Sequence, residues 1–156
     1  MTHRPLPAGF YARETELVAR ELLGATLECT VRGVRCRGRI VETEAYTGED
    51  DAACHAAAGR TARTEVLYGP PGRAYVYFVY GMHWCVNAVT RRAGLPSAVL
   101  IRALEPLEGV DAMRRRRGVK RDRGLPPGQA PLCAALGITG AHNGASLQKS
   151  ALRILR

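Results

Sequence analysis

An aromatic β-hairpin is the sequence feature that most restricts how this chain can fold. Residues 73–80 and 84–90 are runs of alternating residue types, separated only by a short turn at 81–83. Tyrosine, phenylalanine and valine fill these runs, and such residues favour strands. Two strands joined by so short a turn lie antiparallel. Because side chains alternate along a strand, Tyr75 and Tyr77 share one face of this hairpin.

Further segments have the composition of strands. Residues 26–31 and 34–43 flank the turn Arg32-Gly33, which predicts a second hairpin. The run 97–104 is almost continuously apolar, and 151–156 begins another strand. The sequence therefore predicts a mostly antiparallel sheet.

Helices are expected beside this sheet. Apolar residues recur at helical spacing after Thr15, and Gly24 ends the run. Two more helices are expected over 107–117 and 130–136. Strands and helices follow one another without repeats or a linker, which predicts an α+β protein with a single domain over 1–156. The proline-rich residues 1–12 are expected to form a flexible arm, and 47–71 a long loop.

The charge of the chain favours a polyanionic partner. The formal net charge is +9, and all but two of the 23 basic residues are arginines. Arginine matches phosphate geometry with two parallel hydrogen bonds, so a nucleic acid is the expected partner. A bias of the source organism toward arginine would explain part of the excess over lysine, although not the net charge. The densest basic run, 114–123, faces phosphates or is a solvated helix end.

Several classes of protein are disfavoured. No apolar run approaches the ~18 residues of a membrane span, and no signal-like segment follows Met1. We therefore expect a cytoplasmic protein. Five cysteines without a Cys-x-x-Cys pair argue against a disulfide framework and against a zinc ribbon. No metal and no cofactor are expected.

Two carboxylates stand out within this basic chain. Glu42 and Glu44 lie two residues apart on an expected strand, so they share a face with Tyr46. Arg102 lies within the apolar run 97–104, where a buried charge requires a partner, and either glutamate would serve. The acidic stretch is either solvated loop charge, or at least one of its carboxylates takes part in a reaction on the molecule that the basic surface binds. The residues alone favour neither glutamate clearly as a catalytic base.

Together these features suit an enzyme that acts on a base taken out of a duplex. A tyrosine-rich hairpin and the loop residue His55 would supply a pocket in which a flipped base stacks, an interaction worth ~1–3 kcal/mol per base. Breaking the glycosidic bond develops positive charge on the sugar. A carboxylate stabilises that charge and deprotonates the attacking water.

The sequence also resembles a known family, the alkyladenine (3-methyladenine) DNA glycosylases that lack a helix-hairpin-helix. The resemblance covers about residues 9–137. It is carried by His55, Cys85 and Asn87 and by the ordered segments 17–24, 38–46, 69–72, 75–77, 80–83 and 100–109. The resemblance implies a single compact domain with a curved sheet, a protruding hairpin and flanking short helices.

The resemblance assigns roles to particular residues. Glu44 corresponds to the general base that activates water, and Arg102 to the arginine that helps to hold that water and the acid. Tyr46, His55 and Tyr77 correspond to the walls of the base pocket.

Asn87 corresponds to a pocket residue that discourages guanine through its exocyclic amine. Tyr80 corresponds to the wedge inserted into the minor groove, with Met82 beside it. The chain departs from the family near Thr64, where asparagine is usual, and at 128–131, where a lysine is missing.

The resulting hypothesis is a monofunctional DNA-repair glycosylase. It would act as a monomer on double-stranded DNA and release damaged purines of the 3-methyladenine, 7-methylguanine, hypoxanthine and ethenoadenine class, leaving an abasic site. No lyase activity is expected, because neither Lys120 nor Lys149 lies in a pocket segment. The alternatives are a catalytically silent nucleic-acid-binding module and a hydrolase of free nucleosides.

Overall fold

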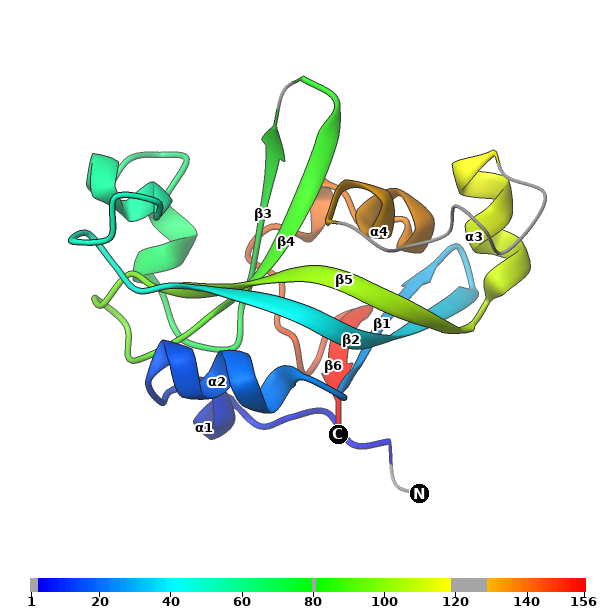
Figure 1. The fold of residues 1–156 in the computed structure, drawn as a ribbon, viewed down its shortest axis with the longest axis horizontal. Helices are drawn as coiled ribbons and strands as arrows, with labels where there is room; N and C mark the ends of the chain where they lie inside the picture. Colours follow the sequence, from blue (N-terminus) through cyan, green and yellow to red (C-terminus); the bar gives the residue numbers. More distant parts are fainter. Residues whose placement is uncertain (1–2, 80, 119–128) are drawn as a thin grey trace.

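A curled antiparallel sheet forms the centre of the computed structural model (Figure 1). The structure describes residues 3–79, 81–118 and 129–156. Within these residues the sheet has six strands in the order β3-β4-β5-β2-β1-β6. The strands are β1 (Thr26–Val31), β2 (Val34–Tyr46), β3 (Ala74–Val79), β4 (His83–Val89), β5 (Ala98–Glu108) and β6 (Leu152–Leu155).

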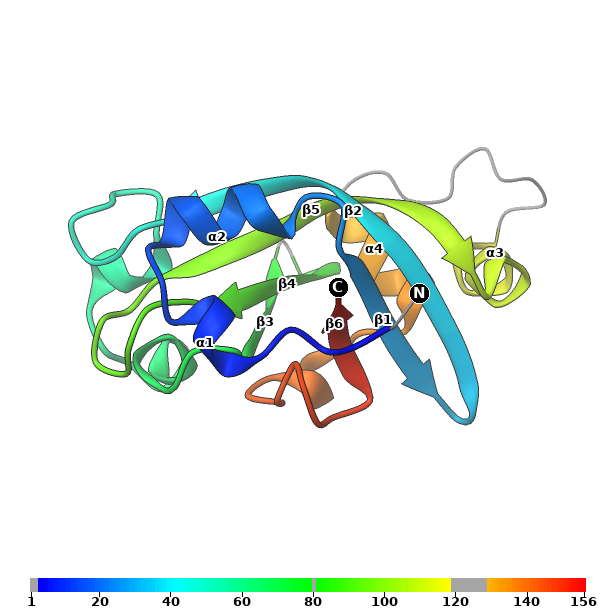
Figure 2. The same cartoon turned by 90° about the horizontal axis from the view of Figure 1, so that it is seen from below.

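Short helices surround this sheet, which confirms the predicted α+β class. They are α1 (Ala8–Tyr11), α2 (Thr15–Leu22), α3 (Val110–Arg117) and α4 (Gln129–Leu136), with the 3₁₀ turns η1 (His55–Ala58), η2 (Glu65–Tyr68) and η3 (Gly140–His142). The hairpin of β3 and β4 rises from the sheet on the side that also carries α3 and α4, whereas α1 and α2 lie on the opposite side (Figures 1 and 2). No helix in the described residues has both the length and the apolarity to cross a membrane.

The segment before β6 draws the two ends of the sheet together. The Ala74 amide at one edge strand donates to the Ala145 carbonyl at 2.8 Å, and the Ile154 amide at the other edge donates to the Leu147 carbonyl at 3.2 Å. Register shifts between β2 and β5 near Glu42 add local bending. The sheet is therefore a half-barrel rather than a flat layer.

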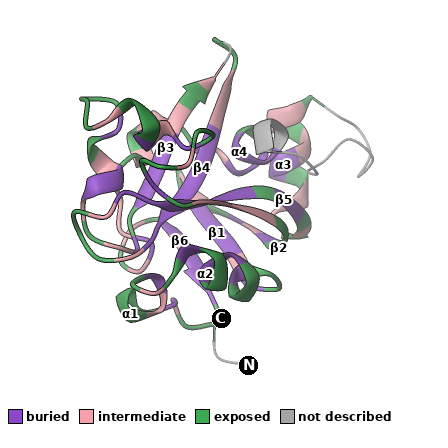
Figure 3. Ribbon diagram, turned by 60° about the vertical axis from the view of Figure 1, so that its left-hand side comes forward, coloured by how far each residue is buried: buried purple, intermediate pink, exposed green. Residues whose placement is uncertain are grey.

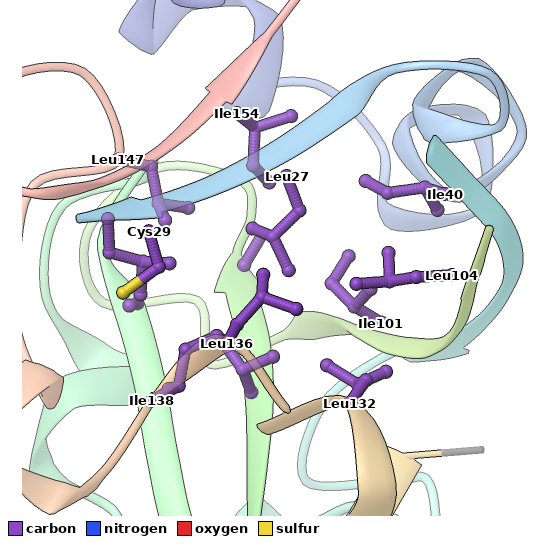
Figure 4. Packing of buried hydrophobic residues seen from close by; sticks show 14 of the residues in the cluster. Leu27, Cys29, Ile40, Ile101, Leu104, Leu132, Leu136, Ile138, Leu147 and Ile154 are labelled. Atoms are coloured by element: carbon purple, nitrogen blue, oxygen red, sulfur yellow. The ribbon is translucent and has the colours of Figure 1, made fainter. Parts of the chain in front are cut away.

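The main core lies between this half-barrel and α4. Figure 4 shows Leu27 and Ile154 from the sheet facing Leu136 of α4, with Ile101 and Leu132 beside them. All five side chains are almost fully buried. Full burial of such a side chain stabilises a fold by ~1.5–3 kcal/mol, so this apolar layer holds the strands that carry the site.

The prediction of a flexible arm over residues 1–12 is wrong for the described residues 3–12. The Leu6 amide donates to the Ile154 carbonyl at 2.9 Å, and Pro5 forms a bridge with Leu155. Leu6 and Tyr11 are buried in the core. Proline richness removes backbone donors, but these two apolar side chains gain enough by burial to hold the segment on the sheet.

The boundary between β5 and α3 also differs from the prediction. The helix expected from residue 107 begins at Val110, because β5 continues as far as Glu108 alongside β2. Gly109 makes the turn with a φ of 79°, and a Cβ atom there would lie 2.6 Å from the Arg35 carbonyl oxygen. Only glycine fits this turn, which sets where the strand gives way to the helix.

Candidate active site

An aromatic cavity of about 100 Å³ lies at the base of the β3–β4 hairpin. The end of β2, the loop that contains η1 and η2, and the two hairpin strands all contribute to its walls. The lining residues are Tyr46, Ala53, Cys54, His55, Leu67, Tyr75, Tyr77, Asn87 and Ala98. Tyr46, His55, Tyr77 and Asn87, four positions predicted for a base pocket, thus come together from three distant parts of the chain.

Three rings form a cluster along one wall of this cavity. The ring centroids of His55 and Tyr77 lie 4.2 Å apart, and those of Tyr75 and Tyr77 lie 5.3 Å apart. Tyr75 and Tyr77 share a face of β3, as the alternation of that strand predicts. Such a cluster offers flat apolar surface on which a planar ring can stack.

His55 is oriented by a side chain that the prediction left out of the site. Its Nδ1 atom lies 2.9 Å from the hydroxyl oxygen of Tyr75, and the two rings meet edge to face. Burial, and then the positive charge of Arg63, lower the pKa of His55 below the usual 6.5. The imidazole is therefore neutral at pH 7 and offers one donor and one acceptor nitrogen.

Glu44 is linked to the cavity by a hydrogen bond from the wall residue Tyr46. The Tyr46 hydroxyl donates to Glu44 Oε2 at 2.6 Å. Burial and this hydrogen bond raise the pKa of Tyr46 to about 12, so the phenol remains a donor at neutral pH. Glu44 lies beside the cavity rather than among its lining residues.

Arg102 bridges the two glutamates of β2. Its Nη1 atom donates to Glu44 Oε1, and its Nε atom lies 3.4 Å from Glu42 Oε2. The predicted pairing is confirmed, but the predicted burial of Arg102 is wrong, because its side chain is 48% exposed. Ile101 and Ala103 point into the core, so strand alternation places Arg102 on the open face of the sheet.

Asn87 lies deep in the cavity wall and is almost fully buried. It lies directly opposite Tyr75 in the β3–β4 register, and its Nδ2 atom donates to the Tyr75 carbonyl at 3.1 Å. This bond fixes the orientation of the amide. A polar side chain held in this way has fixed donor and acceptor positions. It therefore discriminates between the edges of planar rings according to the donors and acceptors that each edge presents.

The hairpin tip is the most exposed apolar part of the molecule among the described residues (Figure 3). Met82 is 71% exposed at the turn. Phe78 and Trp84 contact each other across the strands below it, with tilted rings whose centroids lie 4.7 Å apart. Tyr80, the residue expected to act as a wedge, lies outside the described residues.

The basic run at 114–123 is only partly described. Arg114 pairs with Asp111 at 3.0 Å within α3, and Arg116 turns inward to donate to the Ala135 carbonyl. Residues 119–123 lie outside the described part of the chain. At least one of these arginines therefore supports the fold, and the run is not a uniform phosphate-binding surface.

Thr64, where the family is expected to have asparagine, is a structural residue of the loop. Its hydroxyl donates to the Gly59 carbonyl at 2.9 Å and accepts from the Thr61 amide at 2.8 Å. The departure at 128–131 begins at residue 128, which lies outside the residues that the structure describes.

The residues predicted from the sequence did not include five that line the cavity, which are Ala53, Cys54, Leu67, Tyr75 and Ala98. A signal existed for Tyr75, because it shares a strand face with Tyr77. Ala98 lies opposite Tyr46 in the β2–β5 register, a pairing that the sequence alone does not determine. Cys54 and Leu67 belong to the long loop, where no periodicity indicates which side chains point inward.

The family to which this chain belongs is shown by comparison with known sequences. Residues 9–156 match the model of the family described as methylpurine-DNA glycosylase (MPG). The chain belongs to the methylpurine-DNA glycosylase family. The aromatic cavity and the Glu44–Tyr46 pair lie within the matched region.

Curated relatives are similar to this chain over most of its length. A protein of Myxococcus xanthus is 56% identical over 138 residues, which are 88% of this chain and 66% of the relative. Proteins of Methanocella arvoryzae and Bacillus mycoides are 51% and 48% identical over 91% and 95% of this chain, and over 72% and 76% of their own lengths. Each relative carries the description "Putative 3-methyladenine DNA glycosylase".

Proposed function

We propose that this chain is a DNA-repair glycosylase that releases 3-methyladenine and related damaged purines from duplex DNA. Its family supports the reaction class. The observation that carries the mechanism is a carboxylate, Glu44, hydrogen-bonded at 2.6 Å to the tyrosine that walls an aromatic cavity. A nucleobase enters such a cavity only after it has rotated out of the duplex.

In the proposed reaction, the flipped base stacks against the rings of Tyr46, His55 and Tyr77. A water molecule near Glu44 attacks the sugar C1′ as the bond from C1′ to the base breaks. The base leaves with the electron pair of that bond, and Glu44 takes a proton from the water. The cationic 3-methyladenine leaves as a neutral base, whereas hypoxanthine leaves as an anion that takes up a proton from the solvent. The products are the free base and an abasic site.

The residues around Glu44 suit this role. Arg102 Nη1 holds one carboxylate oxygen and the Tyr46 hydroxyl holds the other, so the carboxylate has a fixed orientation. A fixed negative charge beside the sugar stabilises the positive charge that develops as the bond breaks. Water is the nucleophile, so no lyase activity follows. Lys149, the lysine within the described residues, is not among the lining residues.

The cavity is proposed to select damaged purines by stacking and by hydrogen bonds. A purine methylated at a ring nitrogen, as in 3-methyladenine and 7-methylguanine nucleotides, carries positive charge, which strengthens its stacking on electron-rich rings and makes it a better leaving group. His55 and Asn87 would add the hydrogen bonds that distinguish ring edges. Hypoxanthine, 7-methylguanine and ethenoadenine belong to the proposed class. The partner is double-stranded DNA, and we propose a monomer that acts in the cytoplasm.

The substitution Glu44→Gln tests the proposal. It removes the base while keeping the shape of the side chain, and loss of general-base catalysis lowers rates by roughly 10²–10⁴-fold. Release of hypoxanthine and 3-methyladenine from duplex DNA is measured under single-turnover conditions, and binding to the same duplex is measured separately. We expect release to fall by at least 100-fold while the dissociation constant changes little.

The matched control is Glu42→Gln, which removes the other carboxylate paired with Arg102. It is expected to retain most of the rate. Wild-type turnover in Glu44→Gln would overturn the assignment of the base. A wild-type protein that binds duplex DNA in a salt-dependent way but releases no base would instead support a silent binding module.

A further inference from the structure

A second and larger hollow adjoins the aromatic cavity at Cys54 and His55. Its volume is about 320 Å³, and it shares Cys54 and His55 with the first cavity. The remaining lining residues are Ala52, Ala57, Ala58, Thr61, Arg63 and Thr64. The two hollows therefore differ in chemistry, because one is walled by aromatic rings and the other contains a guanidinium and two hydroxyls.

Arg63 is held in place at the border between this hollow and the hairpin. Its Nη2 atom donates to the Phe78 carbonyl at 3.3 Å, and its guanidinium lies 5.8 Å from the centre of the Tyr77 ring. Arg63 also forms a side-chain hydrogen bond with Tyr75. Its remaining N–H groups are available to a ligand. The side chain is nevertheless exposed. It is therefore oriented by the protein and still accessible to a ligand.

The charge of Arg63 is not neutralised by a described residue. No carboxylate within residues 3–79, 81–118 and 129–156 lies at ion-pair distance from it. Arg60, three residues earlier in the same loop, differs in this respect, because two of its nitrogens bind the Glu65 carboxylate. Arg63 thus presents a full positive charge into the hollow, whereas Arg60 is paired.

We propose that the hollow around Arg63 binds a backbone phosphate of the flipped nucleotide while its base occupies the aromatic cavity. This inference rests on the proposed function. A flipped nucleotide has a flat apolar end and an anionic end joined through one sugar. The two hollows adjoin at Cys54 and His55 and match these two ends. A guanidinium is the side chain best suited to a phosphate, because its fork matches two oxygens.

The experiment is a thermodynamic cycle that combines the substitution Arg63→Gln in the protein with the neutralisation of one phosphate in the DNA. Duplexes with one hypoxanthine are prepared with a methylphosphonate at the phosphate 5′ to the lesion, at the phosphate 3′ to it, or at a remote phosphate. The enzyme concentration that gives half-maximal single-turnover release is measured for each pair, together with the limiting rate. A cycle of this kind isolates the interaction between two groups.

We expect Arg63→Gln to raise the half-maximal concentration about tenfold on ordinary duplex, as fits the loss of a charge-assisted bond. On the duplex in which the phosphate bound by Arg63 is neutral, the same substitution should change the half-maximal concentration less than about twofold. The remote methylphosphonate should leave the tenfold effect intact. The slope of log affinity against log salt should fall by about one counterion.

Arg60→Gln is the matched control and should have an effect under about twofold on every duplex, because its charge is already paired. Equal effects of Arg63→Gln on all duplexes would overturn the proposal. So would a lower limiting rate with an unchanged half-maximal concentration, which would make Arg63 only a support for Tyr77. A wild-type protein that releases no base would instead contradict the proposed function, and the same cycle would then be measured by duplex binding.

Discussion

At the scale of single residues, the candidate site is a set of side chains that orient one another. Tyr75 holds His55, Tyr46 holds Glu44, and Asn87 is tied to the backbone of the neighbouring strand. Each contact joins a pocket residue to a rigid strand. The geometry is therefore formed before any ligand arrives, which lowers the cost of ordering the site during binding.

The protonation of His55 gives a residue-scale prediction. Burial and the Arg63 charge both disfavour the imidazolium, so the pKa of His55 lies below 6.5 and the ring stays neutral as the pH falls from 7 toward that lower value. Removing Arg63 deletes the smaller of the two causes. Arg63→Gln should therefore raise the pKa of His55 without bringing it above 6.5.

The measurement is an NMR titration of the His55 ring proton, assigned from its loss in His55→Gln. Arg60→Gln should leave the midpoint unchanged, because burial and Arg63 are the causes of the shift. A wild-type midpoint at or above 6.5 would contradict the prediction, and so would a midpoint that does not respond to Arg63→Gln.

At the scale of elements, the β3–β4 hairpin has two functions along its length. Its base supplies Tyr75, Tyr77 and Asn87 to the cavity. Its far end projects from the sheet with Met82 at the turn, on the side away from α2 (Figure 1). The cross-strand pair of Phe78 and Trp84 stiffens the region between them, as aromatic pairs do in sheets.

The exposure of Met82 makes the hairpin testable. An apolar side chain this exposed adds little to stability, but it would fill the gap that a flipped base leaves in a duplex. Met82→Ala should change the free energy of unfolding by less than about 0.5 kcal/mol. It should lower single-turnover release from duplex DNA more than release from a single strand.

Leu23→Ala is the matched control, because Leu23 is an exposed apolar residue at the end of α2 on the other side of the sheet. It should affect neither substrate. Equal losses on duplex and single strand for Met82→Ala would argue against a role in opening the duplex. The resemblance assigns the main wedge to Tyr80, and Tyr80→Ala in the same assay should give the larger difference between the two substrates.

At the scale of the whole molecule, several arginines form ion pairs that link the strands of the sheet. Carboxylates pair with arginines across β6, β1, β2 and β5, so part of the basic excess is neutralised on the sheet itself. The centre of this network is Glu28, which is 2% exposed and binds Arg37 and Arg153, both at 2.6 Å. Burial alone would raise the pKa of Glu28, but the hydrogen bonds from these two arginines outweigh burial and lower it.

The lowered pKa sets the pH dependence of stability. The contribution of ionised Glu28 is present above the unfolded-state value of about 4.5 and is lost as the pH falls through the lower folded-state pKa. Glu28→Gln should therefore cost about 2 kcal/mol of unfolding free energy at pH 7. The difference from wild type should shrink steadily below pH 4.5.

Urea unfolding at several pH values measures this contribution. Glu105→Gln is the control, because its pair with Arg39 is half-exposed at 3.3 Å and should contribute under about 1 kcal/mol. A Glu28→Gln difference that stays constant down to pH 3 would show that lost packing, rather than lost charge, causes the change.

Local patterns in the sequence were enough to identify the strands, α2, α4 and the shared face of Glu42, Glu44 and Tyr46, because alternation and helical spacing reflect the nearest neighbours of each residue. Together with the resemblance, they also selected four of the residues that line the cavity. They did not determine the exposure of Arg102, the docking of residues 3–12 or the start of α3. These depend on which face of the sheet the core covers and on how far β5 follows β2, and both are set by contacts between residues distant in the chain. The hollow around Arg63 likewise exists only because the loop packs against the hairpin.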